Sequence, residues 1–327
     1  MKKTLLASAI LASLVSVSAQ AATVYDADGS TLKISGDVDV TAYSDDSVDG
    51  TIGNASYASI NLFGTTTISD SVTAYAEFEI DTGSYSTAES KFGADVDGDG
   101  EDDSVKTSEF AIDELLVGFD TAYGDFSFGD TSSALGQISD FTDVGNNFAG
   151  SQEVIEGEGE TGFAYANTFD ALTVNAEFKA SSEDEEDSIG ISAVYSLNGL
   201  SVGLGFVTVD EADELAFGLG YSMDALYVGL GYAMGAIDAD IDFTSIELAV
   251  TYGVTDDVTV MAFYGTGEVE FGSLSADYLD YYALEVEYSI ASNVSAYVGY
   301  KSNNLDEYSD ESDDSDTSIY TQISYDF

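Results

Sequence analysis

The sequence predicts an all-β chain that closes into a transmembrane antiparallel β-barrel of about 16 strands. Segments of about ten residues alternate apolar and polar side chains, as strands do when their two faces meet different surroundings. Short turns and long acidic stretches alternate between these segments. Proline is absent, and no segment carries the usual devices that protect edge strands, which disfavours a soluble β-sandwich.

The expected strands follow one another along the whole chain. In VTAYAEFEID the residues at even positions from Val72 to Ile80 are apolar, whereas those at odd positions are polar or tyrosine. In the last segment, SIYTQISYDF, Ile319, Ile323 and Phe327 share one face. We expect this last strand to pair with the first, because lipid requires a barrel without open edges. The segments lie near residues 31–43, 55–67, 72–82, 109–119, 124–130, 161–168, 172–180, 188–197, 200–208, 213–222, 225–233, 242–252, 257–268, 279–290, 293–301 and 316–327.

The connections are of two kinds. Short turns are expected at Ser69-Asp70, Asn198-Gly199, Met223-Asp224, Thr255-Asp256 and Ser292-Asn293. Long acidic loops are expected at 44–54, 83–108, 131–160, 181–187, 209–213, 234–241, 268–278 and 302–315. Outer-membrane barrels have short turns at the periplasmic end and longer loops outside.

The N-terminus predicts export. Lys2 and Lys3 precede an apolar run over residues 5–17, and Ala19-Gln20-Ala21 fits a small-x-small cleavage site. We therefore expect a signal peptide at 1–21 and an outer-membrane barrel at 22–327.

The composition excludes several functions. The chain has 62 acidic and 7 basic residues, with a formal net charge of −55, so like charge repels nucleic acid and anionic surfaces. A hydrophobic content of 44% is too high for a disordered acidic chain. Histidine and cysteine are absent, which removes the usual nucleophile pairs and zinc sites. We expect no enzymatic activity and no cofactor.

A calcium or other divalent-cation site is a separate hypothesis for the loop around DVDGDGEDD. Asp95, Asp97 and Asp99 precede Gly100 as in the first half of a calcium-binding loop, and Asp103 is a further candidate ligand. The position that needs a bidentate glutamate holds Lys106, so a solvated acidic loop is the alternative.

The chain resembles the general diffusion porins of Gram-negative outer membranes. ATVYDADGSTLKISGDVD resembles the first strand of that family, and YASINLFGTTTI its second. YGDFSFGD followed by DFTDVGNNFAG resembles the fifth strand and the third loop. Phe327 is similar to the closing aromatic residue that the barrel assembly machinery reads. The resemblance implies a homotrimer in the outer membrane, in contact with lipid and lipopolysaccharide.

The resemblance also implies that the extracellular loop at 131–160 folds into the barrel and narrows it, with loop acids facing wall bases. Of the loop acids only Asp143 is retained, and Asn147 and Ser151 stand at two others. The wall bases are matched by Asp37, Ser59, Asp113, Asp130 and Glu158. Glu114 is the alternative to Asp113, because the alternation there is ambiguous.

The resemblance and the alternation together predict a pore of one charge sign. Alternation alone places Asp37 and Ser59 on the lumen face, with Lys33 and Lys179 as inward bases. Further acids fall on polar faces at Asp39, Glu77, Glu79, Glu177, Glu247, Glu285 and Glu287. We expect passive diffusion of small hydrophilic solutes with a preference for cations.

Two other functions remain open. The first is an oligosaccharide-selective porin that uses a line of aromatic residues at Tyr57, Phe63, Tyr75, Phe243 and Tyr281. The second is an acidic surface barrel that serves adhesion or divalent-ion binding.

Overall fold

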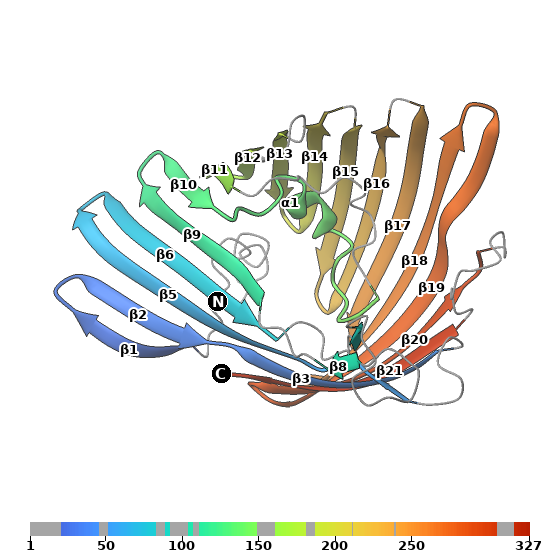
Figure 1. The fold of residues 1–327 in the computed structure, drawn as a ribbon, viewed down its shortest axis with the longest axis horizontal. Coiled ribbons are helices and arrows are strands. Elements are labelled where there is room, and N and C mark those ends of the chain that lie inside the picture. The colour runs from blue at the N-terminus through green and yellow to red at the C-terminus, as the bar shows by residue number, and fades with distance from the viewer. Residues whose placement is uncertain are drawn as a thin grey trace.

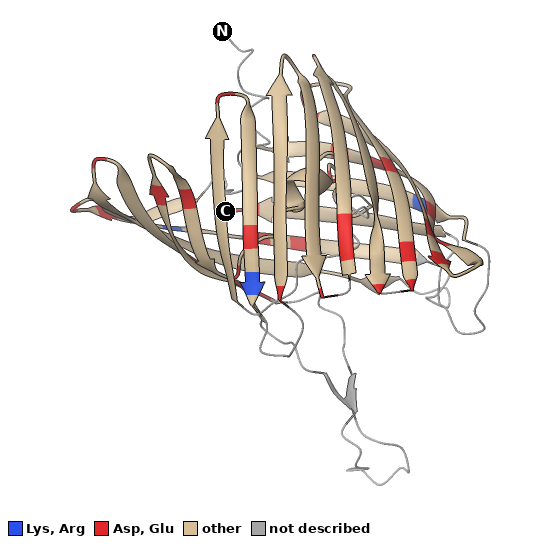
Figure 2. Cartoon of the chain, turned by 90° about the horizontal axis from the view of Figure 1, so that it is seen from above, with Lys and Arg blue, Asp and Glu red and all other residues tan. Residues whose placement is uncertain are grey.

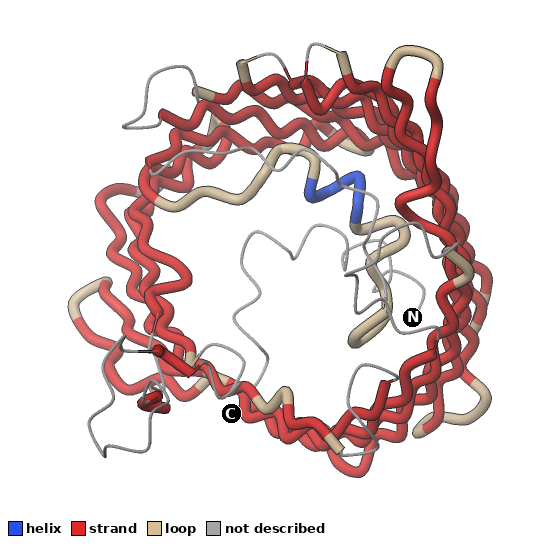
Figure 3. The backbone as a smooth tube through the Cα atoms, turned by 45° about the vertical axis from the view of Figure 1, so that its right-hand side comes forward, coloured by secondary structure: helices blue, strands red, loops and turns tan. Residues whose placement is uncertain are grey.

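The computed structural model describes residues 21–45, 52–82, 89–91, 104–106, 111–148, 161–180, 187–210, 212–238, 240–305 and 317–327. Within this part of the chain the fold is a closed antiparallel barrel of 16 strands, as predicted. Figure 3 shows the ring of strands, with helix α1 (Gly136–Ser139) inside it. No helix in the described ranges has the length and hydrophobicity to cross a membrane.

Figure 1 labels most of the strands. Their bounds are β1 (Ala22–Ala27), β2 (Ser30–Ser35), β3 (Asp37–Asp45), β4 (Gly53–Asn54), β5 (Tyr57–Ser69), β6 (Val72–Asp81), β7 (Glu89–Lys91), β8 (Ser104–Lys106), β9 (Ala111–Thr121), β10 (Gly124–Gly129), β11 (Thr161–Phe169), β12 (Leu172–Ala180), β13 (Ser188–Leu197), β14 (Leu200–Val209), β15 (Ala212–Met223), β16 (Leu226–Asp238), β17 (Ile241–Gly253), β18 (Val258–Phe271), β19 (Leu274–Ala291), β20 (Val294–Asn303) and β21 (Thr317–Asp326).

The last strand closes the barrel on the first. β21 pairs with β3 in a register that sets Tyr320 opposite Tyr43. Gly36 and Phe327 then exchange two backbone hydrogen bonds, of 3.0 and 2.9 Å. Closure of this kind removes the open sheet edges that lipid cannot satisfy.

The first barrel strand has two halves, β2 and β3, that meet at Gly36. β21 lies beside β3, while β1 lies beside β2 with Ala22 opposite Ile34. A Cβ atom on Gly36 would lie 2.8 Å from the ring of Phe327, so glycine makes room for the final residue. The sheet contains 19 strand segments, of which β2 and β3 count as one barrel strand and β1 and β4 are short flanking pieces.

Burial is inverted relative to a soluble protein. Apolar side chains such as Ile191 and Leu204 are 53% and 54% exposed on the outer surface, whereas Glu247 is fully buried on the inner side. β14 shows the pattern along one strand, because every second residue from Leu200 to Phe206 is exposed and the residues that alternate with them are buried. Such an outer face suits contact with hydrocarbon.

A row of tyrosines marks one end of the apolar band. Each of five strands from β13 to β21 carries an outward tyrosine close to its end, between 45% and 51% exposed. These residues are Tyr195, Tyr221, Tyr252, Tyr288 and Tyr325. Aromatic rings of this kind lie at membrane–water interfaces.

Three of the predicted long loops are tight turns. Only two residues separate β14 from β15, β16 from β17, and β18 from β19. The predicted loops at 209–213, 234–241 and 268–278 were therefore wrong. Acidic residues there end the apolar pattern, but antiparallel pairing continues into water, where polar side chains suit both faces of a strand. β19 begins in this way, with four exposed residues from Leu274 to Asp277.

Candidate pore constriction

The described half of the third loop, residues 131–148, lies inside the barrel against its wall. Helix α1 packs on β13, β14 and β15 (Figures 1 and 3). Leu135, Ile138 and Phe141 are almost completely buried between the loop and the wall. The loop is therefore attached through an apolar contact within an otherwise polar lumen.

Glycines on the inner wall make room for these side chains. A Cβ atom on Gly203 would lie 2.7 Å from Ile138, and one on Gly205 would lie 2.5 Å from Leu135. A Cβ atom on Gly229 would overlap the carbonyl oxygen of Phe141. Larger residues at these inward positions are thus incompatible with the observed loop position.

The sequence interpretation missed this surface. The signal is present in GLGF, FGLGY and VGLGY of three successive strands, where glycine takes the inward positions. A strand face without side chains indicates that another backbone or side chain approaches it closely.

Glu285 of β19 holds the far end of the described loop. Its carboxylate is fully buried and accepts hydrogen bonds from the backbone N–H groups of Asn146, Asn147 and Phe148, at 2.7, 2.9 and 3.1 Å. The hydroxyl of Tyr320 donates a fourth bond of 2.8 Å. The carboxylate therefore ties the loop backbone to two wall strands, β19 and β21.

We predict that Glu285→Gln loosens this attachment. A glutamine amide replaces one acceptor oxygen with a donor, so backbone N–H groups of the loop lose their acceptor at about 1–3 kcal/mol each. The pore should then show more frequent brief closures in single-channel recordings. Glu287→Gln is the matched control. The Glu287 carboxylate lies on the same strand but accepts hydrogen bonds from the wall residues Ser289 and Ser295 rather than from the loop backbone. Equal closure rates in both variants would contradict the prediction.

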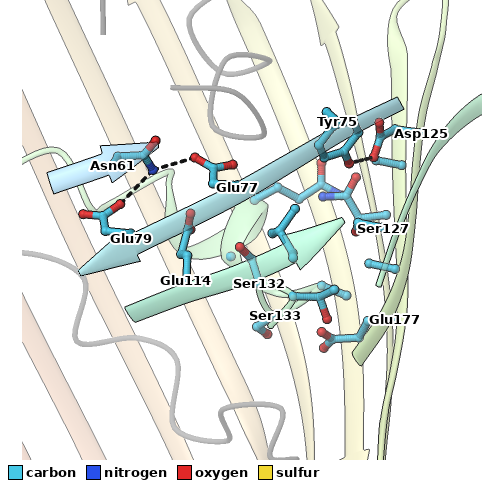
Figure 4. Close-up of a pocket in the computed structure, with 18 of the residues that line it drawn as sticks. Asn61, Tyr75, Glu77, Glu79, Glu114, Asp125, Ser127, Ser132, Ser133 and Glu177 are labelled. Carbon is cyan, nitrogen blue, oxygen red and sulfur yellow. Dashed lines mark hydrogen bonds between the residues drawn. The ribbon is translucent and has the colours of Figure 1, made fainter. Parts of the chain in front are cut away.

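Facing the loop, the wall from β3 to β12 forms an acidic cavity of about 460 Å³ (Figure 4). The loop contributes Asp140, and no lysine is among the described residues that line this cavity. The amide of Asn61 donates to Glu77 and Glu79, at 2.7 and 3.1 Å. The lining acids are Asp37, Glu77, Glu79, Glu114, Asp125, Asp140, Glu177 and Asp326.

The structure brings part of the predicted set together. Asp37 and Ser59 both line this cavity, and the Ser59 hydroxyl donates to Asp37 at 2.5 Å. Asp143 and Asn147 lie on the loop with exposed side chains. Asp130 is exposed where the chain leaves β10, and its N–H donates to the Leu115 carbonyl. Ser151, Glu158 and the calcium candidates Asp95, Asp97, Asp99 and Asp103 lie outside the described residues.

A β-bulge explains the ambiguity at Asp113 and Glu114. The register of β6 and β9 passes from Glu79 opposite Glu114 to Ile80 opposite Ile112, so Asp113 is the extra residue. A bulge of this kind shifts the alternation by one position. Glu114 lines the cavity, whereas the side chain of Asp113 lies outside the described part.

Asp143 sits in a strongly negative environment. Its side chain reaches the lumen, yet desolvation by the loop and wall, followed by the charges of Glu247 and Glu285, raises the pKa of this carboxyl. Its ionisation therefore depends on how well those two wall acids are compensated.

The aromatic candidates differ in their exposure to the lumen. Phe63, Phe243 and Tyr281 are buried, and Tyr57 and Tyr75 are partly buried. Among the described residues there is also no group of three or more acids arranged to hold a metal ion.

An inside-out barrel with a loop packed in a polar lumen defines a pore-forming membrane protein. The family model for Gram-negative porins matches residues 7–308, and the chain belongs to this family. It is 28% identical to outer membrane protein U of Vibrio parahaemolyticus, over 94% of this chain and 91% of that protein. The protein is thus a porin of the outer membrane, and porins are channels.

Solved structures share the fold. The structure of Salmonella typhi OmpF in complex with daunomycin superposes with a TM-score of 0.75 at 18% identity, covering 94% of this chain and all of that one. The trimer form of OmpT of Vibrio cholerae gives a TM-score of 0.66 at 16% identity, over 92% of this chain and 100% of that chain.

Proposed function

We propose that this porin passes small hydrophilic solutes by diffusion and prefers cations. The observation that supports the preference is the cavity between wall and loop, whose charged lining residues are all acidic among those described. In a porin that resembles the general diffusion family, the wall would supply bases at the positions of Asp37 and Ser59. Their replacement removes the positive side of the pore.

The mechanism is electrostatic. Carboxylates that line a pore raise the local concentration of cations and lower that of anions. In physiological salt each charge acts over about 8 Å, so only acids close to the ion path matter. The wall acids on β3, β6 and β9 and Asp140 on the loop border the same cavity, so an ion inside it is near several of them at once.

A planar bilayer under a salt gradient tests the proposal. With concentrated salt on one side, the potential at zero current should be positive on the dilute side, because cations cross faster. A negative potential there would overturn the preference for cations. A barrel that conducts no ions would instead favour the role as a surface protein.

We also propose a homotrimer that joins through the outer faces of β2, β3, β5 and β6. In the described residues of these strands the exposed large apolar side chains are all aliphatic, and the tyrosine row is confined to β13–β21. Small outward residues such as Ala74 and Ala76 allow close approach of another subunit. In the bilayer experiment, conductance should then rise in groups of three equal steps, and single steps would contradict the trimer.

A further inference from the structure

One asparagine on the inner wall joins two of the cavity acids. The side-chain nitrogen of Asn61 on β5 donates hydrogen bonds to Glu77 at 2.7 Å and to Glu79 at 3.1 Å, both on β6 (Figure 4). All three residues line the acidic cavity. A carboxylate accepts hydrogen bonds but donates none, so the nitrogen of the amide, and not its oxygen, has to face both acids. One neutral side chain therefore holds two carboxylates.

The strand register explains why Glu79 needs such a donor. Glu79 is the direct cross-strand partner of Asn61 on one side and of Glu114 on the other. Like charges placed directly opposite each other on neighbouring strands repel. The bond to Asn61 holds the Glu79 carboxylate on the β5 side of its strand, which is the side away from β9 and Glu114.

Glu77 reaches the same nitrogen from the next inward position of β6. Residues two apart on a strand point to the same face, with their backbones about 6.6 Å apart. The two bonded carboxylate oxygens can be no farther apart than the two bond lengths together, because they share one donor. No lysine is among the described residues that line the cavity, so no base there offsets the pair.

Other wall acids of the cavity also have neutral donors. The hydroxyl of Ser59, two residues before Asn61 on the same face of β5, donates to Asp37 at 2.5 Å. The hydroxyl of Tyr75 donates to Asp125 at 2.6 Å. A hydroxyl or an amide orients a carboxylate without cancelling its charge, whereas lysine or arginine would neutralise it. Neutral donors thus position the acids and leave their charge available to ions in the lumen.

We propose that Asn61 is a positioning residue for cation selectivity: its amide holds Glu77 and Glu79 together as one doubly negative group at the cavity. The proposal rests on the cation-preferring pore proposed above. Asn61 itself carries no charge. It acts through the two carboxylates, which without their common donor would turn apart and act less strongly on a passing ion.

Reversal potentials in planar bilayers under a salt gradient test the proposal. Asn61→Leu keeps the size of the side chain and removes both hydrogen bonds. The permeability ratio of potassium to chloride should fall about fivefold, which corresponds to two unit charges that move from about 4 to about 8 Å from the ion in a water-like dielectric. Asn61→Ala, which adds no bulk, gives the same comparison if leucine in the polar lumen prevents folding.

Asn167→Leu is the matched control. The side-chain nitrogen of Asn167 on β11 also donates to two acceptors, the carbonyl of Tyr123 at 2.9 Å and the hydroxyl of Tyr165 at 3.0 Å, and neither is an acid. Asn167 is not among the residues that line the cavity. This variant loses the same kind of bonds and should keep the permeability ratio of the parent. An equal fall in both variants would contradict the proposal.

A combined variant separates positioning from packing. Glu77→Gln with Glu79→Gln should lower the permeability ratio, and the addition of Asn61→Leu should lower it no further, because the amide would then have no charge to position. A further fall of similar size on that background would refute the role of Asn61. An unchanged ratio in the glutamine double variant would refute it too, because the two acids would then not act on the ion path.

The outcomes distinguish this proposal from the one on which it rests. If the parent itself prefers anions, the cation-preferring pore fails and the role of Asn61 falls with it. If the parent prefers cations but Asn61→Leu keeps the parent ratio, only the role of Asn61 fails. A purely structural role for Asn61 would change the conductance at an unchanged reversal potential, and that result would also overturn the proposal.

Discussion

Replacing Glu77, Glu79 and Glu114 by lysine should reverse the ion selectivity of the pore. The three carboxylates lie on neighbouring strands, β6 and β9, and border one cavity (Figure 4). Three ammonium groups there would repel cations and attract anions. A change of about 1.4 kcal/mol in the free energy of an ion at this point changes the permeability ratio about tenfold. The reversal potential under a salt gradient should change sign.

The corresponding glutamine triple variant is the control. It removes the charges but keeps the size of the side chains, so the selectivity should weaken without reversing. Folding is checked on gels by comparing heated with unheated samples, because a folded barrel and an unfolded chain migrate differently. A lysine variant that folds and still prefers cations would show that ions pass the constriction elsewhere in the lumen.

Gly229→Val should displace the third loop and raise the single-channel conductance. The new side chain would occupy the position of the Phe141 carbonyl, which also accepts a 2.8 Å hydrogen bond from Tyr227. Loss of the Phe141 packing alone corresponds to about 3–5 kcal/mol, as for other buried phenylalanines. Valine suits a β-strand, so the barrel itself should still form.

Gly253→Val is the matched control for this variant. Gly253 lies on the inner face of β17, and the nearest atom to a Cβ there would be 3.7 Å away, an ordinary contact distance. Conductance should remain that of the parent. An unchanged conductance in Gly229→Val would mean that the loop does not limit the flow of ions.

The charge pattern on the described strands agrees with the sequence interpretation. Figure 2 shows many acidic and few basic positions on the barrel. The periodicity that places Asp37 and Ser59 on the lumen face is local, because each strand alternates by itself. The number of strands follows from the same local pattern, and the closure of β21 on β3 follows from the need to leave no open edge in lipid, so the sequence predicts both.

The contacts that shape the lumen are not local. Phe141 meets Gly218 and Gly229, and Asn147 meets Glu285, in each case across a large sequence separation. The alternation of residues within one strand does not predict such a contact with a distant part of the chain. The bulge at Asp113 shifts the alternation in the middle of β9. The inward position of Lys301 on β20 is seen only from its contact with the ring of Tyr281.

The bond that completes the ring joins Gly36 to Phe327, residues separated by nearly the full chain. Contacts between such distant residues form slowly, because the whole intervening loop must first be ordered. Until the barrel closes, the chain has two sheet edges with unpaired backbone groups and an exposed apolar outer surface. Both features promote aggregation. These edges and this apolar surface therefore have to stay covered until β21 pairs with β3.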